Sequence, residues 1–193
     1  MRRLLSLILV LSSCGYKTAD PEEKTTIAVP YVKGDVEGQL TGAIVRQLNE
    51  SGLYEYVHNE GDYELKIDLA TDRNDTIGYK YNRSEKKGKI EHNLMATENR
   101  RTLTAEIQLL RGEEVVVGPV SVSTSTDYDY IDINSLKELT FTTPQGKRGK
   151  TIRLSLGQLD SIEGAQDAAL HPLYNQLAQK IVDVLQRSIV PDA

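Results

Sequence analysis

Three short segments contain residue types that could bind a phosphate or a calcium ion, or act as a nucleophile. Residues 149–151, Gly-Lys-Thr, match the end of a phosphate-binding loop, but Pro144 stands where that loop needs a glycine. The acidic run 127–132 imitates a calcium loop, but Ile131 occupies the third ligand position. Residues 84–87 have the Ser-x-x-Lys spacing of a serine nucleophile, without a second such signature nearby. These residues give no positive support for an enzyme, a cofactor or a metal site.

The one cysteine, Cys14, lies in a setting that does predict chemistry. The basic start Met-Arg-Arg precedes a mostly apolar run, residues 4–11, which is shorter than the roughly 20 residues of a membrane-spanning helix. Leu-Ser-Ser-Cys at 11–14 then looks like a bacterial lipobox, in which the thiol is acylated and the chain is cut before the cysteine. We interpret residues 1–13 as a lipoprotein signal peptide and Cys14 as the lipidation site. The alternative is a free cysteine behind an unrelated leader.

The mature chain predicted in this way is acidic and held at a membrane. Removing residues 1–13 from 193 leaves 180, and the loss of Arg2 and Arg3 changes the formal net charge from −5 to −7. This balance argues against nucleic-acid binding, and a single cysteine excludes an intramolecular disulfide and cysteine-based zinc sites. Residues 14–24 are polar and aperiodic, which predicts an acylated tether. Several acyl chains would anchor it firmly.

Periodicity in the first third of the mature chain predicts two short strands around one helix. Residues 25–31 are rich in β-formers and contain a proline near their end, which predicts an edge strand. Asp35 is placed to cap a helix whose apolar positions start at Val36 and recur every four residues, and Gly52 is placed to end it. Residues 53–57 predict the second strand.

Two alternating segments and one long amphipathic segment predict the remaining elements. Residues 62–70 and 102–109 alternate apolar and polar side chains, as in strands with one covered face. A tight turn at 111–114 predicts a hairpin between the second of these and a strand over 115–124. The last 30 residues predict a helix with a kink or a new start at Pro172.

These elements, in the order β-α-β-β-β-α, predict a single α+β domain over residues 25–193. Two helices would pack on one face of a mostly antiparallel sheet. Residues 72–99 and 127–160 lack a clear period and are predicted to be long loops, a class that is often functional. In the second of these, Tyr128 and Tyr130 could be interface anchors or the exposed face of a strand, and we favour the interface.

The order of these segments resembles one family of envelope lipoproteins. The mature chain opens with Cys-Gly-Tyr at 14–16, where the LPS-assembly lipoprotein family (LptE) has Cys-Gly plus an aromatic residue. The following segments also match the family layout: the strand at 26–31, Gly-Gln-Leu-Thr at 38–41, Asp-Tyr-Glu-Leu at 62–65 and Ala-Gln-Lys-Ile-Val at 178–182. Residues 127–164 look longer than the enterobacterial pattern.

The resemblance implies a lipid-anchored protein on the periplasmic side of the outer membrane. Such a protein plugs and helps assemble the LPS-translocating β-barrel (LptD-like) and contacts lipopolysaccharide (LPS) during its delivery to the surface, without bond chemistry. The alternative is a periplasmic adaptor lipoprotein, TolB-amino-terminal-like or synthase-activator-like, that binds another cell-envelope protein. The strand at 26–31 followed by a helix suits those modules as well. A third hypothesis is that the chain is a lipoprotein enzyme.

Basic residues gather in one part of this acidic chain and are the candidates for LPS contact. Seven basic residues face three acidic ones between residues 80 and 101. A basic patch at the end of a strand pair could hold the phosphates of lipid A and the inner core, with arginine giving bidentate contacts. The alternative is a solvated loop with scattered charges. The seven are Lys80, Arg83, Lys86, Lys87, Lys89, Arg100 and Arg101, and a smaller cluster contains Lys147, Arg148, Lys150 and Arg153.

Overall fold

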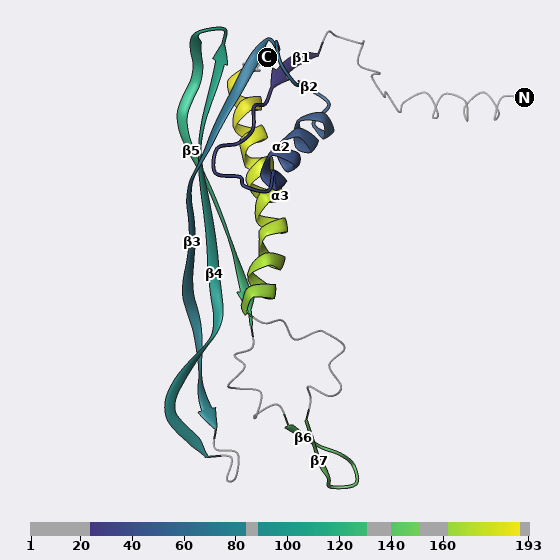
Figure 1. Ribbon diagram of the computed structural model, residues 1–193, viewed down its shortest axis with the longest axis vertical. Coiled ribbons are helices and arrows are strands. Elements are labelled where there is room, and N and C mark those ends of the chain that lie inside the picture. Colours follow the sequence, from purple (N-terminus) through teal and green to yellow (C-terminus); the bar gives the residue numbers. More distant parts are fainter. Residues whose placement is uncertain (1–23, 84–88, 131–139, 151–161, 190–193) are drawn as a thin grey trace, which may run out of the picture.

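A five-stranded sheet with two helices on one side dominates the computed structural model (Figure 1), which describes residues 24–83, 89–130, 140–150 and 162–189. The elements in chain order are β1 (Thr25–Ala28), α2 (Gln39–Glu50), β2 (Tyr54–Val57), β3 (Tyr63–Arg83), β4 (Ile90–Arg111), β5 (Glu114–Asp129), β6 (Thr140–Thr142), β7 (Arg148–Lys150) and α3 (Ile162–Ile189). The predicted α+β class is therefore confirmed.

The strand order of the sheet is β2-β1-β3-β4-β5, and β6 and β7 form a separate two-stranded hairpin. β1 runs parallel to both β2 and β3, while the long pairings of β3 with β4 and of β4 with β5 are antiparallel. The prediction that β1 is an edge strand is wrong, because β1 lies between two neighbours. Pro30 does not interrupt either ladder, since it lies two residues after Ala28, the last residue of the strand.

The core lies between the helices and the part of the sheet nearest to them. The predicted alternation holds here, because Leu65 on β3 and Leu103 and Ile107 on β4 are buried in one cluster with both helices. The largest side chains that are fully buried are Tyr54, Ile27, Leu40, Ile44, Leu48, Leu65, Leu103, Ile107, Leu109, Leu173, Leu177 and Ile181. This single cluster holds α2, α3 and the sheet together.

Helix α2 begins later than the sequence predicts. Gly38 has a φ of +72° and precedes the first helical residue, Gln39. Val36 consequently lies outside the helix and is 92% exposed, not part of an apolar stripe. Asp35 still serves this end of the helix, because its buried carboxylate accepts hydrogen bonds from the amide and the hydroxyl of Thr41, at 2.7 and 2.8 Å.

Helix α3 runs without interruption through Pro172, so the predicted new start at that residue is not observed. Leu173 and Leu177 on this helix are buried against the sheet and α2. In the part of the chain that the structure describes, no helix has the length and apolar character needed to cross a membrane.

The largest difference from the prediction concerns residues 72–99. Most of this region is not a loop, because β3 extends to Arg83 and β4 begins at Ile90, which makes them strands of 21 and 22 residues. Register shifts interrupt their pairing at four places, one after Leu69 and three between Thr76 and Arg83. Figure 1 shows this hairpin extending well past the N-terminal end of α3. Similarly, β5 continues to Asp129, into the segment predicted as the second loop.

Candidate functional site

The β3–β4 hairpin carries the predicted LPS-contact residues at two levels. Arg100 and Arg101 pair with Asp75 and Asn74, whereas Lys80 lies five residues further along β3. At about 3.3 Å per residue, the two levels are roughly 17 Å apart. The described residues of the predicted basic patch therefore form a middle pair and a group near the distal ends of β3 and β4.

The group near the tip is only partly described. Lys80 is half-buried, and Lys89 is exposed just before β4 begins. Arg83 ends β3 opposite Ile90, but its side chain is not described, and Lys86 and Lys87 lie outside the described residues. Within the described part of the chain, neither Lys80 nor Lys89 takes part in an ion pair.

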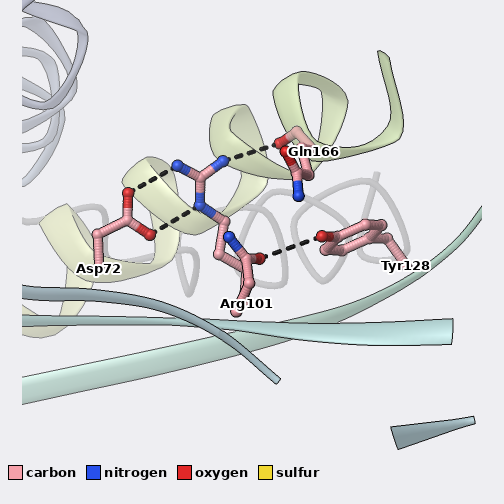
Figure 2. Close-up of polar contacts among 5 residues, drawn as sticks. Asp72, Arg101, Tyr128 and Gln166 are labelled. Carbon is pink, nitrogen blue, oxygen red and sulfur yellow. Dashed lines mark hydrogen bonds and ion pairs between the residues drawn. The ribbon is translucent and has the colours of Figure 1, made fainter. Parts of the chain in front are cut away.

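The side chain of Arg101 is mostly covered and is hydrogen-bonded to other residues of the protein. Its guanidinium donates hydrogen bonds of 2.8 and 2.6 Å to the two carboxylate oxygens of Asp72, and a third of 3.1 Å to the main-chain carbonyl of Gln166 (Figure 2). Only 13% of the Arg101 side chain is exposed. The hydrogen bonds to Asp72 raise the pKa of Arg101 above its ordinary value. Arg101 thus joins β3 and β4 to the first turns of α3.

Arg100, the neighbouring residue, points to the opposite face of β4 and forms a more exposed pair. Its guanidinium donates to both carboxylate oxygens of Asp127 on β5, at 2.6 and 2.8 Å. The side chains of the two residues are 48% and 40% exposed. The hydrogen bonds from Arg100 lower the pKa of Asp127 below its ordinary value. This pair is accessible to an anionic ligand, but the ligand would have to displace Asp127.

Tyr128 belongs to a hydrogen-bonded group at the same level as Arg101. Its hydroxyl donates to Oδ1 of Asn74 at 3.1 Å and accepts from Nδ2 of Asn99 at 3.3 Å. Its ring centre is 6.4 Å from that of Tyr130. The structure thus gives Tyr128 partners within the sheet, where the sequence had favoured an external interface.

An exposed apolar face near the tip was not identified from the sequence. Tyr79, Tyr81 and Leu94 are 59%, 55% and 60% exposed. Tyr81 pairs with Leu94 and Tyr79 with Ala96, so these side chains share one face of the hairpin. We call Tyr79, Tyr81 and Leu94 the distal apolar face. The alternating Tyr-Lys-Tyr at 79–81 was the available signal.

The sheet face opposite the helices is polar and charged. Glu64, Lys66 and Asp68 alternate with buried apolar residues on β3, so they point away from the core. Lys33 forms an ion pair with Asp68 over this face. These residues line, with Glu106, Gln108 and others, a hollow of about 430 Å³.

The smaller basic cluster is described only in part. Lys147 lies exposed in the turn between β6 and β7, and Arg148 and Lys150 belong to β7. Arg153 lies outside the described residues. Among the residues that the structure describes, no group of three or more His, Cys, Asp or Glu side chains could hold a metal ion.

A family model described as LptE, Lipopolysaccharide-assembly, matches residues 25–185 of this chain. No curated protein sequence matches it. Among solved structures, rare lipoprotein B from Shewanella oneidensis is 14% identical with a TM-score of 0.49, over 86% of this chain and 96% of that one. A minor lipoprotein from Acinetobacter baumannii is 12% identical with a TM-score of 0.44, over 86% and 90% of the two chains. Lipoprotein B from Nitrosomonas europaea is 10% identical with a TM-score of 0.43, over 86% of each chain.

Proposed function

Since the chain belongs to the LptE family of lipopolysaccharide-assembly proteins, we propose that it plugs the LPS-translocating β-barrel, an LptD-like protein, at the outer membrane. In this role it also helps the barrel to assemble and contacts LPS on its way to the cell surface. The observation that carries the proposal is the family match, which spans residues 25–185. Acylation at Cys14, after removal of residues 1–13, would hold the protein on the periplasmic side.

The proposed plug acts through shape and polarity. A large β-barrel has a polar interior that would leave an aqueous hole if nothing filled it. The open face of the sheet suits such a wall, because Lys33, Glu64, Lys66 and Asp68 present both signs of charge there. Interfaces of this polar kind are wet and gain specificity from complementary charges.

The proposed LPS contact lies near the tip of the β3–β4 hairpin. Lys80 and Lys89 have no ion-pair partner in the described part of the chain, so their ammonium groups are available to phosphates. Arg83, Lys86 and Lys87 belong to the same stretch of sequence and add to its positive charge. Arg100 would contribute by exchanging Asp127 for a phosphate. Arg101 would act indirectly, by holding the hairpin to α3.

Affinity purification of the tagged, acylated protein from detergent-solubilised envelopes tests this proposal. A stoichiometric partner whose gel mobility changes on heating, as a β-barrel's does, together with LPS in the eluate, would support it. Recovery of a cell-wall synthase or an inner-membrane protein instead would favour the adaptor function. A Cys14→Ser variant is the control, because it should lose membrane attachment while keeping the folded domain.

LPS contact is tested separately by binding measurements on a Lys80→Gln/Lys89→Gln variant. Weaker binding of LPS, with an unchanged unfolding midpoint, is expected because only exposed or half-buried cations are removed. Lys66→Gln is the matched control for Lys80→Gln alone, since Lys66 is equally cationic but lies at the opposite end of β3. Equal loss in both variants would mean that overall charge, not the hairpin tip, determines LPS binding.

A further inference from the structure

The distal apolar face exposes three large side chains at a place where the fold does not need them. Tyr79, Tyr81 and Leu94 lie beyond the core cluster, which on β3 and β4 is formed by residues nearer to the helices. Large exposed apolar side chains grouped on one surface mark contacts with other molecules. Lys80 and Met95 point to the other face of the same strands, and Met95 is buried.

We infer that the distal apolar face binds the acyl chains of an anionic glycolipid, while the neighbouring lysines bind its phosphates. This inference rests on the proposed contact with LPS, and it names the surface that takes the apolar part of that ligand. If only the phosphates were bound, removal of the acyl chains would not change the affinity of the protein for LPS. Binding at the distal apolar face makes this affinity depend on the acyl chains.

The composition of this surface favours an amphiphile over the wall of a barrel. The interior of a large barrel is polar, so it offers little for Leu94 and the rings of Tyr79 and Tyr81 to pack against. Tyrosine combines an apolar ring with a polar hydroxyl and is enriched where acyl chains meet head groups. Lys80 lies between the two tyrosines in sequence, and Lys89 precedes β4 on the partner strand. Cationic groups therefore lie at the same level of the hairpin as the distal apolar face, with Lys80 on the reverse face of β3 and Lys89 just before β4.

The distance between this surface and the tether favours a ligand from another molecule over the acyl chains on Cys14 of the same chain. β1, which directly follows the predicted tether, pairs with β3 at Tyr63, and Tyr81 lies 18 residues further along β3. At about 3.3 Å per residue, the separation is roughly 60 Å. A tether of residues 14–24 spans at most about 40 Å. Figure 1 shows the paired distal ends of β3 and β4 far from β1, toward the other end of the sheet.

Tryptophan fluorescence provides a direct test, because the chain contains no tryptophan. The full mature chain is prepared as a Leu94→Trp variant and as a matched Val116→Trp variant, whose site on β5 is 44% exposed but lies beside the C-terminal end of β4. Both carry Cys14→Ser, so that no detergent is needed. Purified LPS should shift the emission of Leu94→Trp to shorter wavelength, and deacylated LPS should not. An equal shift in the Val116→Trp protein, or no shift in either, would overturn the inference.

Binding constants separate this inference from the proposed function. A Tyr81→Ser/Leu94→Ser variant should bind LPS about 10- to 100-fold more weakly, since each side chain removed is worth on the order of a tenfold change. Its binding of deacylated LPS should stay at the wild-type level, and Val115→Ser/Val116→Ser is the matched control. If wild-type protein binds neither ligand, the proposed LPS contact fails. If it binds both equally well and the variant matches it, only the acyl-chain inference fails. Normal LPS binding with loss of the barrel partner would make the face a protein interface, and would also overturn the inference.

Discussion

Arg101 and Arg100 are adjacent in sequence, and both hold a carboxylate with two hydrogen bonds, yet replacing them should have different consequences. We predict that Arg101→Met destabilises the fold clearly and Arg100→Met only slightly. Methionine keeps much of the side-chain volume and removes every donor. In Arg101→Met, Asp72 and the carbonyl of Gln166 both lose their partner.

The expected magnitude follows from the burial of the pair. An exposed ion pair contributes about 0–1 kcal/mol, and breaking a buried one costs about 3–5 kcal/mol. Arg101 is 13% exposed and Asp72 is 36% exposed, so the unpaired carboxylate of Asp72 can recover part of its hydration. The loss should therefore lie between the two limits, at about 2 kcal/mol. For a domain of this size, that corresponds to a fall of about 4–8 °C in the unfolding midpoint.

Urea and thermal unfolding of both variants, in the same buffer, measure this difference. Added salt should reduce the small effect of Arg100→Met further, because its pair with Asp127 is 48% and 40% exposed and is screened by ions. Equal losses of stability in the two variants would refute the reasoning, since exposure is the property that distinguishes the two pairs. A loss below about 0.5 kcal/mol in Arg101→Met would refute it as well, because surface substitutions fall in that range.

Three further predictions concern the anchor, the strand junction and the core. Cys14→Ser should abolish incorporation of labelled palmitate and release the protein from the membrane fraction. Asp62→Asn should lower the urea midpoint at pH 7, because the carboxylate of Asp62 accepts hydrogen bonds from the amide and hydroxyl of Thr26 at 2.9 and 2.7 Å. These bonds lower the pKa of Asp62 below 3.8, so the difference from wild type should be full above pH 4 and shrink as pH falls below it. Leu173→Ala, at a fully buried position, should cost about 2–5 kcal/mol in urea unfolding.

The strands could be predicted from the sequence only in the part of the sheet that the helices cover. Residues 62–70 and 102–109 alternate strictly because one face of each strand packs on the core, and the structure confirms both as strands. The later start of α2 could not be predicted in this way. Asp35 does serve the helix, but through Thr41, and the left-handed Gly38 between them displaces the first turn.

The continuation of β3 and β4 was missed because the alternation changes phase. The register shift after Leu69 moves even-numbered residues of β3 to the face that odd-numbered ones occupy before it. Asp72 consequently points toward α3, where its partner is Arg101. A search for one uninterrupted alternation of apolar and polar residues therefore interprets this part of β3 as an irregular polar segment. The pairing of Asp72 with Arg101, 29 residues later, follows from the strand register and could not be read from the two charges alone.

The two ends of the β3–β4 hairpin have different roles. Near the helices, β3 and β4 supply core residues, and substitutions there change the free energy of unfolding. At the level of Arg101, the hairpin makes a polar contact with the first turns of α3. Beyond that level, Tyr79, Tyr81 and Leu94 contribute little to the core. These positions can therefore be adapted to a ligand without a loss of stability. A hairpin built in this way can alter its distal contacts without loss of the fold, because the Arg101 contacts hold its middle to α3. Variants of the distal apolar face should therefore leave the unfolding midpoint unchanged, even when LPS binding falls.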